Sequence, residues 1–198
     1  MQGIDHRLLL MGLAMVVLMY SCGENPSSMS DLRSFDLKGL ADGQVTTLSQ
    51  GGYRIQKISQ LGPSQDKTEY RPDSSGWKRE LDILRNADIS KPGLRPYYSY
   101  TNYDSVDLIV EHYALTDTGQ SDVIYQKVYH HKNSGLLWKI EVLQQVNNPI
   151  YNSSRIIQAI FREEDNQQML LDSLKVKGFQ HMIISDTTFY QTTCKILK

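Results

Sequence analysis

The chain has 198 residues, of which 40% are hydrophobic and 22% charged, and its formal net charge is -1. This length and composition are typical of a folded domain with a hydrophobic core and exclude wholesale disorder. A chain so close to neutral shows no global bias toward nucleic acid, so we expect no nucleic-acid partner.

The N-terminus carries an apolar run, residues 8–19, directly after a basic start. The run is shorter than the about 20 residues that cross a bilayer, and this pattern is typical of an export signal. It ends in Leu18-Met19-Tyr20-Ser21-Cys22, which resembles a bacterial lipobox. The resemblance implies a signal peptide, 1–21, cleavage before Cys22, and lipid on Cys22. A buried N-terminal helix and an uncleaved membrane anchor are the alternatives.

The residues after the lipobox are small, polar and helix-breaking. We therefore expect residues 22–30 to form a lipidated tether and residues 31–198 to form a single domain. The chain has two cysteines, Cys22 and Cys194, so acylation of the first leaves the second without a disulfide partner. Cys194 lies in a strand-like run and is predicted to be a small core residue rather than a catalytic thiol.

Helical periodicity predicts two helices in the first half of the domain. The first spans residues 30–50 and ends at Gly51-Gly52, and the second starts after a cap at Ser74 or Ser75. Each has one apolar face that can cover a sheet. These faces contain Leu37, Ala41, Val45 and Leu48 in the first helix, and Trp77, Leu81 and Leu84 in the second.

The remaining segments alternate or are rich in β-forming residues, and short turns join them. Such a pattern predicts a sequential antiparallel sheet, either flat or curved into a half-barrel. In the segment 136–146, apolar Leu136, Trp138, Ile140 and Val142 alternate with polar residues, which predicts one dry face. The fold is therefore expected to be α+β, with the helices on that face. The expected strands are 53–58, 68–71, 105–115, 122–131, 136–146, 155–163, 169–177, 179–185 and 187–197.

Three short segments resemble a group of uncharacterised bacterial envelope lipoproteins: Phe35-Asp36-Leu37-Lys38, Trp77-Lys-Arg-Glu-Leu81 and Ala87-Asp-Ile-Ser-Lys-Pro92. The resemblance implies an α+β mature domain anchored in the cell envelope, on the periplasmic side of the inner or outer membrane. It implies no activity.

No segment carries a motif for catalysis or metal binding. His130 and His131 are adjacent on a predicted strand and therefore point to opposite faces, so they cannot share a metal ion. The carboxylates of 163–165 fall in a polar turn, where nothing raises the pKa of a general acid. We therefore expect neither an enzyme nor a bound metal or cofactor.

A tyrosine-rich stretch, residues 96–103, joins the helical part to the sheet. It is either a first strand or loop over the sheet edge, or an aromatic surface for a partner protein or a glycan. The candidate binding surface consists of Tyr97, Tyr98, Tyr100, Tyr103, Trp77 and Trp138.

Two functions stay open at this point, and both include the membrane as a partner through the N-terminal lipid. The first is non-enzymatic binding of an apolar ligand or lipid, in a cavity of several hundred Å³ between helices and sheet. The second is a structural or assembly subunit that docks to another envelope protein.

Overall fold

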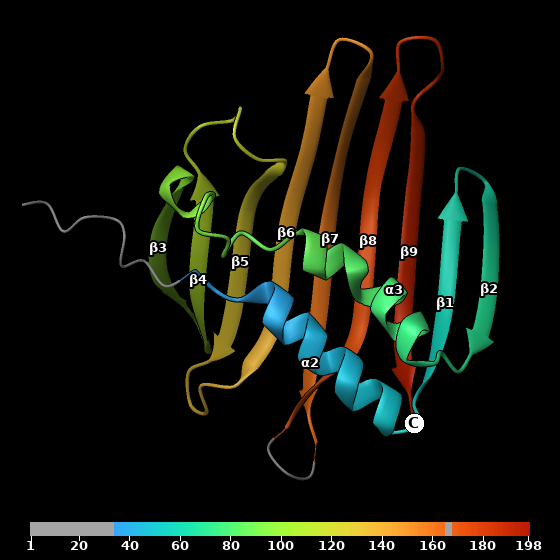
Figure 1. The fold of residues 1–198 in the computed structure, drawn as a ribbon, viewed down its shortest axis with the longest axis vertical. Helices are drawn as coiled ribbons and strands as arrows, with labels where there is room; N and C mark the ends of the chain where they lie inside the picture. Colours follow the sequence, from blue (N-terminus) through green and yellow to red (C-terminus); the bar gives the residue numbers. More distant parts are fainter. Residues whose placement is uncertain (1–33, 165–167) are drawn as a thin grey trace, which may run out of the picture. The chain divides into compact units, whose positions relative to one another are not determined.

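The computed structural model describes residues 34–164 and 168–198, so the expected signal peptide and the whole expected tether, including Cys22, lie outside the described residues. The described chain contains two α-helices, one 3₁₀ helix and nine strands (Figure 1). The helices are α2 (Leu37–Gln50), α3 (Ser74–Asn86) and the 3₁₀ helix η2 (Arg95–Tyr97). The strands are β1 (Arg54–Leu61), β2 (Ser64–Tyr70), β3 (Tyr98–Ser105), β4 (Leu108–Leu115), β5 (Val123–His131), β6 (Leu137–Asn148), β7 (Tyr151–Glu163), β8 (Met169–Met182) and β9 (Thr188–Leu197).

All nine strands belong to one antiparallel sheet with the order β2-β1-β9-β8-β7-β6-β5-β4-β3. From β3 to β9 each strand pairs with the next one in the chain, which confirms the predicted sequential arrangement. The hairpin β1–β2 comes before these strands in the chain but adds to the sheet beside β9, the last strand. The sheet is not closed, because β2 and β3 form its two edges.

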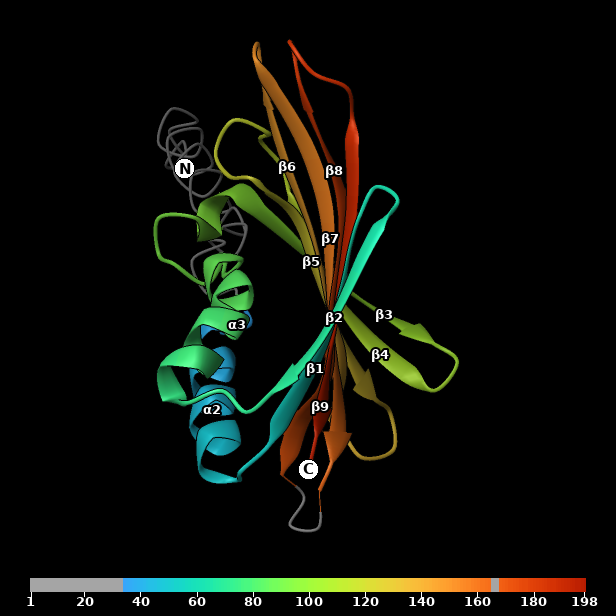
Figure 2. The ribbon, with the colours of Figure 1, turned by 90° about the vertical axis from the view of Figure 1, so that its right-hand side faces the viewer.

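Both helices lie on the same face of the sheet (Figure 2). Each begins at an aspartate whose carboxylate accepts a backbone N–H: Asp36 from Gly39 at 2.7 Å, and Asp73 from Gly76 at 2.6 Å. The cap of α3 is therefore Asp73, and the expected cap at Ser74 or Ser75 is wrong, since both serines lie inside the helix. The first helix begins at Leu37, later than expected.

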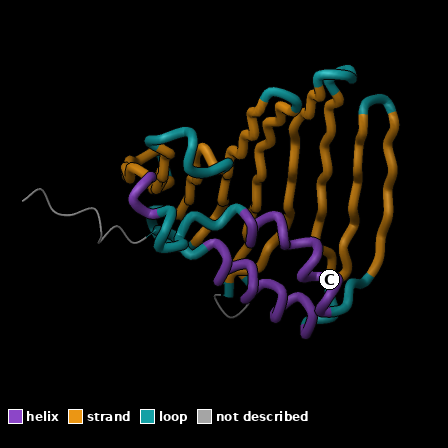
Figure 3. The backbone as a smooth tube through the Cα atoms, turned by 45° about the horizontal axis from the view of Figure 1, so that its top comes forward, coloured by secondary structure: helices purple, strands orange, loops and turns teal. Residues whose placement is uncertain are grey.

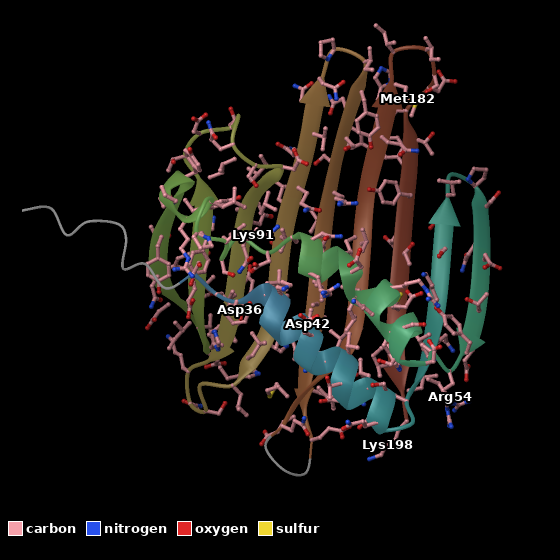
Figure 4. The ribbon with its side chains drawn as sticks, viewed as in Figure 1. Asp36, Asp42, Arg54, Lys91, Met182 and Lys198 are labelled. Atoms are coloured by element: carbon pink, nitrogen blue, oxygen red, sulfur yellow. The ribbon has the colours of Figure 1, made fainter. Side chains whose placement is uncertain are left out.

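A salt bridge and a shared hydrophobic core hold the helices in place. Arg85 of α3 reaches Asp42 of α2, with 2.6 Å between guanidinium Nε and carboxylate Oδ1 (Figure 4 labels Asp42). Beneath the helices, apolar side chains of both layers are fully or almost fully buried, which confirms the predicted dry face at Ile140 and Val142, whereas Leu136 is only half-buried. They include Leu37, Leu48, Trp77, Leu81, Leu84, Val128, Ile140, Val142, Ile157, Leu174 and Cys194.

The structure corrects the expected boundary between two strands. The expected break at Gly178, between the strands 169–177 and 179–185, does not exist, because β8 runs through this point. A Cβ atom on Gly178 would collide with the carbonyl oxygen of Ser154 on β7, so the glycine permits close approach of two strands and marks no turn. The tyrosine-rich stretch forms most of η2 and β3, which is the edge strand that one of the two interpretations expected.

The long central strands continue past the helices, so part of the helix-side face is uncovered at one end (Figure 3). Among the described residues, no helix combines the length and hydrophobicity needed to cross a membrane. The opposite face of the sheet, called the open face below, is covered by no helix of the described chain (Figure 2).

Candidate functional site

The structure does not bring the six aromatic residues of the predicted binding surface together. Trp77 is fully buried on the side of α3 that faces the sheet. Tyr98 is 4% exposed, and its hydroxyl donates to the carbonyl of Val123 at 2.6 Å. Tyr97 and Tyr100 pack against the same core on the helix side. Of the six residues, only Tyr103 and Trp138 lie away from the helix-side core.

Trp138 lies on the open face because of a β-bulge that the sequence pattern did not reveal. Tyr129 pairs with Lys139, but the next residue, His130, pairs with Leu137, so Trp138 has no partner in the ladder. The extra residue shifts the alternation by one position. The prediction that Trp138 shares a face with Ile140 and Val142 is therefore wrong.

Side chains on the open face fall into rows, because neighbouring strands pair in register between the β-bulges. Three such rows cross the whole sheet from β2 to β3. The first row is Glu69, Gln56, Lys195, Ser173, Ile160, Lys139, Tyr129, Val110 and Tyr103. The second is Lys67, Ile58, Thr193, Lys175, Gln158, Glu141, Lys127, His112 and Thr101. The third is Gln65, Gln60, Gln191, Lys177, Ile156, Leu143, Tyr125, Ala114 and Ser99.

Aromatic rings gather on the open face over β4, β5 and β6, toward the β3 end of the rows. We call Tyr125, Tyr129, Trp138 and His112 the aromatic cluster. The rings of Tyr129 and Trp138 meet edge to face, with centroids 6.1 Å apart, and His112 meets Tyr125 in the same way at 5.8 Å. Both distances lie in the favourable range for aromatic pairs. Figure 2 shows this end of the sheet, with β3 and β4, turned away from the helices.

Lysine ammonium groups lie over the same rings. Nζ of Lys139 is 4.1 Å from the ring centroid of Tyr129 and 5.5 Å from that of Trp138, and Nζ of Lys127 is 5.0 Å from that of Tyr125. Contacts of this kind are cation–π interactions. They hold the amino groups in place beside aromatic surfaces.

Glu141 is the central hydrogen-bond acceptor of the cluster. Its carboxylate accepts from the amide of Gln158 at 3.0 Å, from the hydroxyl of Tyr125 at 3.2 Å and from the ammonium of Lys139 at 3.3 Å. Only 15% of the Glu141 side chain and 17% of the Lys139 side chain are exposed. These are low values for charged groups on a face without a covering layer.

The pKa values of the cluster follow from this partial burial. For Glu141, burial acts to raise the pKa, but the hydrogen bonds from Gln158 and Lys139 outweigh it, so the pKa is lowered. Burial, followed by the charge of Glu141, raises the pKa of Tyr125 and of Tyr129 to about 12. Burial and the neighbouring Lys127 lower the pKa of His112. At neutral pH the cluster therefore contains neutral phenols and a neutral imidazole, beside the partly buried ion pair of Lys139 and Glu141.

The rest of the open face is basic. Of the two carboxylates in the three rows, Glu69 pairs with Arg54 at 2.7 Å and Glu141 pairs with Lys139. The other lysines of the rows form no ion pair with any described residue, and they project from a face that a large ligand can reach. They are Lys67, Lys127, Lys175, Lys177 and Lys195.

Sequence reasoning identified none of these lysines as site residues. Each occupies a polar position in an alternating strand, a pattern that predicts a solvent-facing side chain but no neighbours. Their placement on one face needs the register of distant strands. One feature of the sequence does point to these lysines: at the outward positions of β8 and β9, lysines outnumber carboxylates.

Hollows on the helix side differ from the cavity expected for an apolar ligand. Beside α3, a hollow of about 310 Å³ is lined in part by Lys57, Arg79, Glu80 and Arg155, so charged groups face it. Cys194 also borders it; the thiol is free and buried, as predicted, and burial raises its pKa to about 11. The described residues contain no group of three or more potential metal ligands.

Comparisons with known proteins do not assign the chain to a family. No protein-family model, no characterised protein and no solved structure matches the chain.

Proposed function

We propose that this chain is a lipoprotein of the bacterial cell envelope, anchored through Cys22, whose domain is a non-enzymatic binding module. The proposed ligand is an anionic glycan, held across the open face of the sheet. The observation that carries the proposal is the combination, on one uncovered face, of lysines without carboxylate partners and a cluster of partly buried aromatic rings.

The chemistry of the face favours an acidic sugar polymer over an apolar small molecule. Sugar rings stack their C–H faces on tyrosine and tryptophan rings, and acidic groups bind ammonium groups. Lys127 and Lys175 lie in one row on strands three places apart, which corresponds to roughly 14 Å at the spacing of a sheet. An extended polymer can bridge such a distance. An apolar ligand needs an enclosed pocket that removes most of its surface from water.

The direct test compares two polymers with the same sugar backbone, the anionic polygalacturonate and its uncharged methyl ester, by titration calorimetry with the full chain. We expect polygalacturonate to bind more tightly and to lose affinity as salt is raised. The double variant Lys175→Gln/Lys195→Gln should lose about tenfold in affinity, because each exposed ionic contact is worth up to about 1 kcal/mol. Trp138→Ala should weaken the binding of both polymers.

The matched control is Lys38→Gln/Lys78→Gln, which removes two exposed lysines from the helices. We expect this variant to bind as the wild type does. Equal affinity for the two polymers, or equal losses in the two double variants, would reject the open face as an anionic glycan site. Co-purification of an envelope protein that masks Trp138 would favour an assembly subunit.

The anchor is tested separately. We expect the N-terminal peptide of protein from bacterial membranes to begin at Cys22 and to carry an acyl mass increment, and Cys22→Ala to release the domain from the membrane. An unmodified Cys22 in membrane-derived protein would reject the anchor and leave the binding face untouched.

A further inference from the structure

Two hairpin turns at one end of the sheet expose a group of large apolar side chains. Ile150 lies in the β6–β7 turn, and Met182, Ile183 and Ile184 lie at the β8–β9 turn (Figure 4 labels Met182). Their exposed fractions are 68%, 46%, 69% and 91%. We call these four residues the apolar tip. They contribute nothing to the hydrophobic core, so the fold gives no reason for them.

The backbone of the apolar tip is already hydrogen-bonded. The side-chain oxygen of Asn148 accepts from the backbone N–H of Ile150 at 3.1 Å and of Tyr151 at 2.9 Å. The N–H of Ser185 donates to the carbonyl of Met182 at 3.0 Å, and the N–H of Ile183 donates to the carbonyl of Ile150 at 3.2 Å. The last bond joins the two turns, so the four residues of the apolar tip lie at the same end of the sheet on neighbouring turns.

The charge of the two turns is low. In the sequence of 147–152 and 180–188, the ionisable side chains are Tyr151, His181 and Asp186 only. Elsewhere on the open face the strands carry lysines. The turns therefore combine high exposure, large apolar side chains, several hydrogen-bonded backbone amides and little charge. These properties lower the cost of entering the interface of a lipid bilayer.

We propose that the apolar tip inserts into the interfacial layer of a lipid membrane. A convex tip fits a deformable bilayer, whereas a stable protein interface engages about 20–30 residues on each side. The tip offers four large side chains on two protruding turns, too few for such an interface, and they can enter lipid together as one unit. This proposal depends on neither the glycan site nor acylation of Cys22.

The experiment places an environment-sensitive NBD fluorophore on the tip of the full chain. All variants carry Cys22→Ser, and Cys194 is buried, so a new cysteine is the labelling site. Ile184→Cys and Ile150→Cys report on the tip. Asn133→Cys, in the exposed β5–β6 turn at the opposite end of the strands, is the control. The probe membrane is a vesicle of phosphatidylethanolamine and phosphatidylglycerol.

We expect the fluorophores at residues 184 and 150 to shift to shorter wavelength on adding vesicles and to be quenched by doxyl-labelled lipid. The fluorophore at residue 133 should stay as in buffer. No shift at residue 184 in protein that floats with the vesicles would overturn the proposal, and so would equal quenching at residues 184 and 133.

A second comparison needs no label. Ile183→Asn/Ile184→Asn should reduce the fraction of protein that floats with vesicles by about tenfold or more, because two large apolar side chains no longer leave water. The matched control is Val106→Asn, which removes an apolar side chain that is 88% exposed in the β3–β4 turn, at the other end of the sheet. It should float as the wild type does, and an equal loss in both variants would overturn the proposal.

Discussion

The two faces of the sheet are built by the same strands but differ in burial and in polarity. On the helix side, one row of side chains crosses five strands and all its members are buried: Cys194, Leu174, Ala159, Ile140 and Val128. The residues next to them in the chain form the matching row on the open face: Thr193, Lys175, Gln158, Glu141 and Lys127.

We infer from this difference that stability and the proposed binding depend on alternate residues of the same strands. The helix-side row is apolar and dry because α2 and α3 cover it, and burial of such surface is the main favourable contribution to folding. The open-face row is charged and keeps contact with water. Substitutions on the helix side should therefore change the free energy of unfolding, and substitutions of exposed lysines on the open face should change binding alone.

The two tryptophans give the largest expected contrast between the faces. Trp77 is 0% exposed beneath α3, so Trp77→Ala should lower the free energy of unfolding by about 3–5 kcal/mol. Trp138 is half-buried on the open face, and Trp138→Ala should cost about 1–2 kcal/mol. Urea unfolding followed by circular dichroism measures both. Equal losses would contradict the division of roles.

A conservative variant sharpens this test. The indole Nε1 of Trp77 is buried and has no hydrogen-bond partner among the described residues. Trp77→Phe therefore loses packing volume but no hydrogen bond, and it should be clearly less destabilising than Trp77→Ala. A loss as large as that of the alanine variant would mean that the N–H has a partner in solution.

Leu174 and Lys175 make the same comparison between adjacent residues of one strand. Leu174 is 3% exposed on the helix side. We expect Leu174→Ala to lower the free energy of unfolding by about 2–4 kcal/mol, because it leaves a cavity between sheet and helices. The affinity for polygalacturonate, measured below the unfolding transition, should not change. A folded Leu174→Ala protein with lost affinity would show that the faces are coupled.

The sequence predicts the helix side of this fold better than the open face, for a physical reason. Periodic apolar residues mark the buried faces of α2, α3 and the central strands, because a core needs continuous apolar surface. Polar residues at the outward positions obey no such requirement. The sequence therefore predicts which side chains face water but not which of them become neighbours.

Trp138 and Gly178 show where local pattern failed. A bulge of one residue reversed the face of Trp138, and no short-range signal distinguishes it from plain alternation. Glycine is typical of turns, yet Gly178 permits a close approach to Ser154 on the preceding strand, β7. Both depend on pairing between strands. The aromatic cluster could not be assembled from the sequence for the same reason.

Glu141 is the exception on the open face, since it is charged and yet largely buried. Glu141→Gln leaves the ammonium of Lys139, which is 17% exposed, without its carboxylate. We expect a loss of about 1–2 kcal/mol at neutral pH. The control Glu69→Gln breaks an exposed pair with Arg54 on the same face and should cost less than about 0.5 kcal/mol.

The effect of Glu141 depends on pH in a defined direction. Its pKa in the folded protein lies below the ordinary value of 4.5, so its stabilisation is complete above pH 4.5 and is lost as the pH falls through the folded pKa. The difference in unfolding free energy between the wild type and Glu141→Gln should therefore shrink as the pH is lowered from neutral toward 3. A difference that grows at low pH would contradict the hydrogen bonding described for Glu141.

The smallest expected change in stability belongs to Lys175, and it separates the two roles most clearly. Lys175 forms no ion pair with a described residue, so Lys175→Gln should shift the free energy of unfolding by no more than about 0.5 kcal/mol. The same variant should weaken polygalacturonate binding several-fold, since it removes one ionic contact. Unfolding and calorimetry on one preparation give both values. A destabilised Lys175→Gln with unchanged binding would mean that the lysine supports the fold, and that the charge of the open face is a by-product of keeping that face wet.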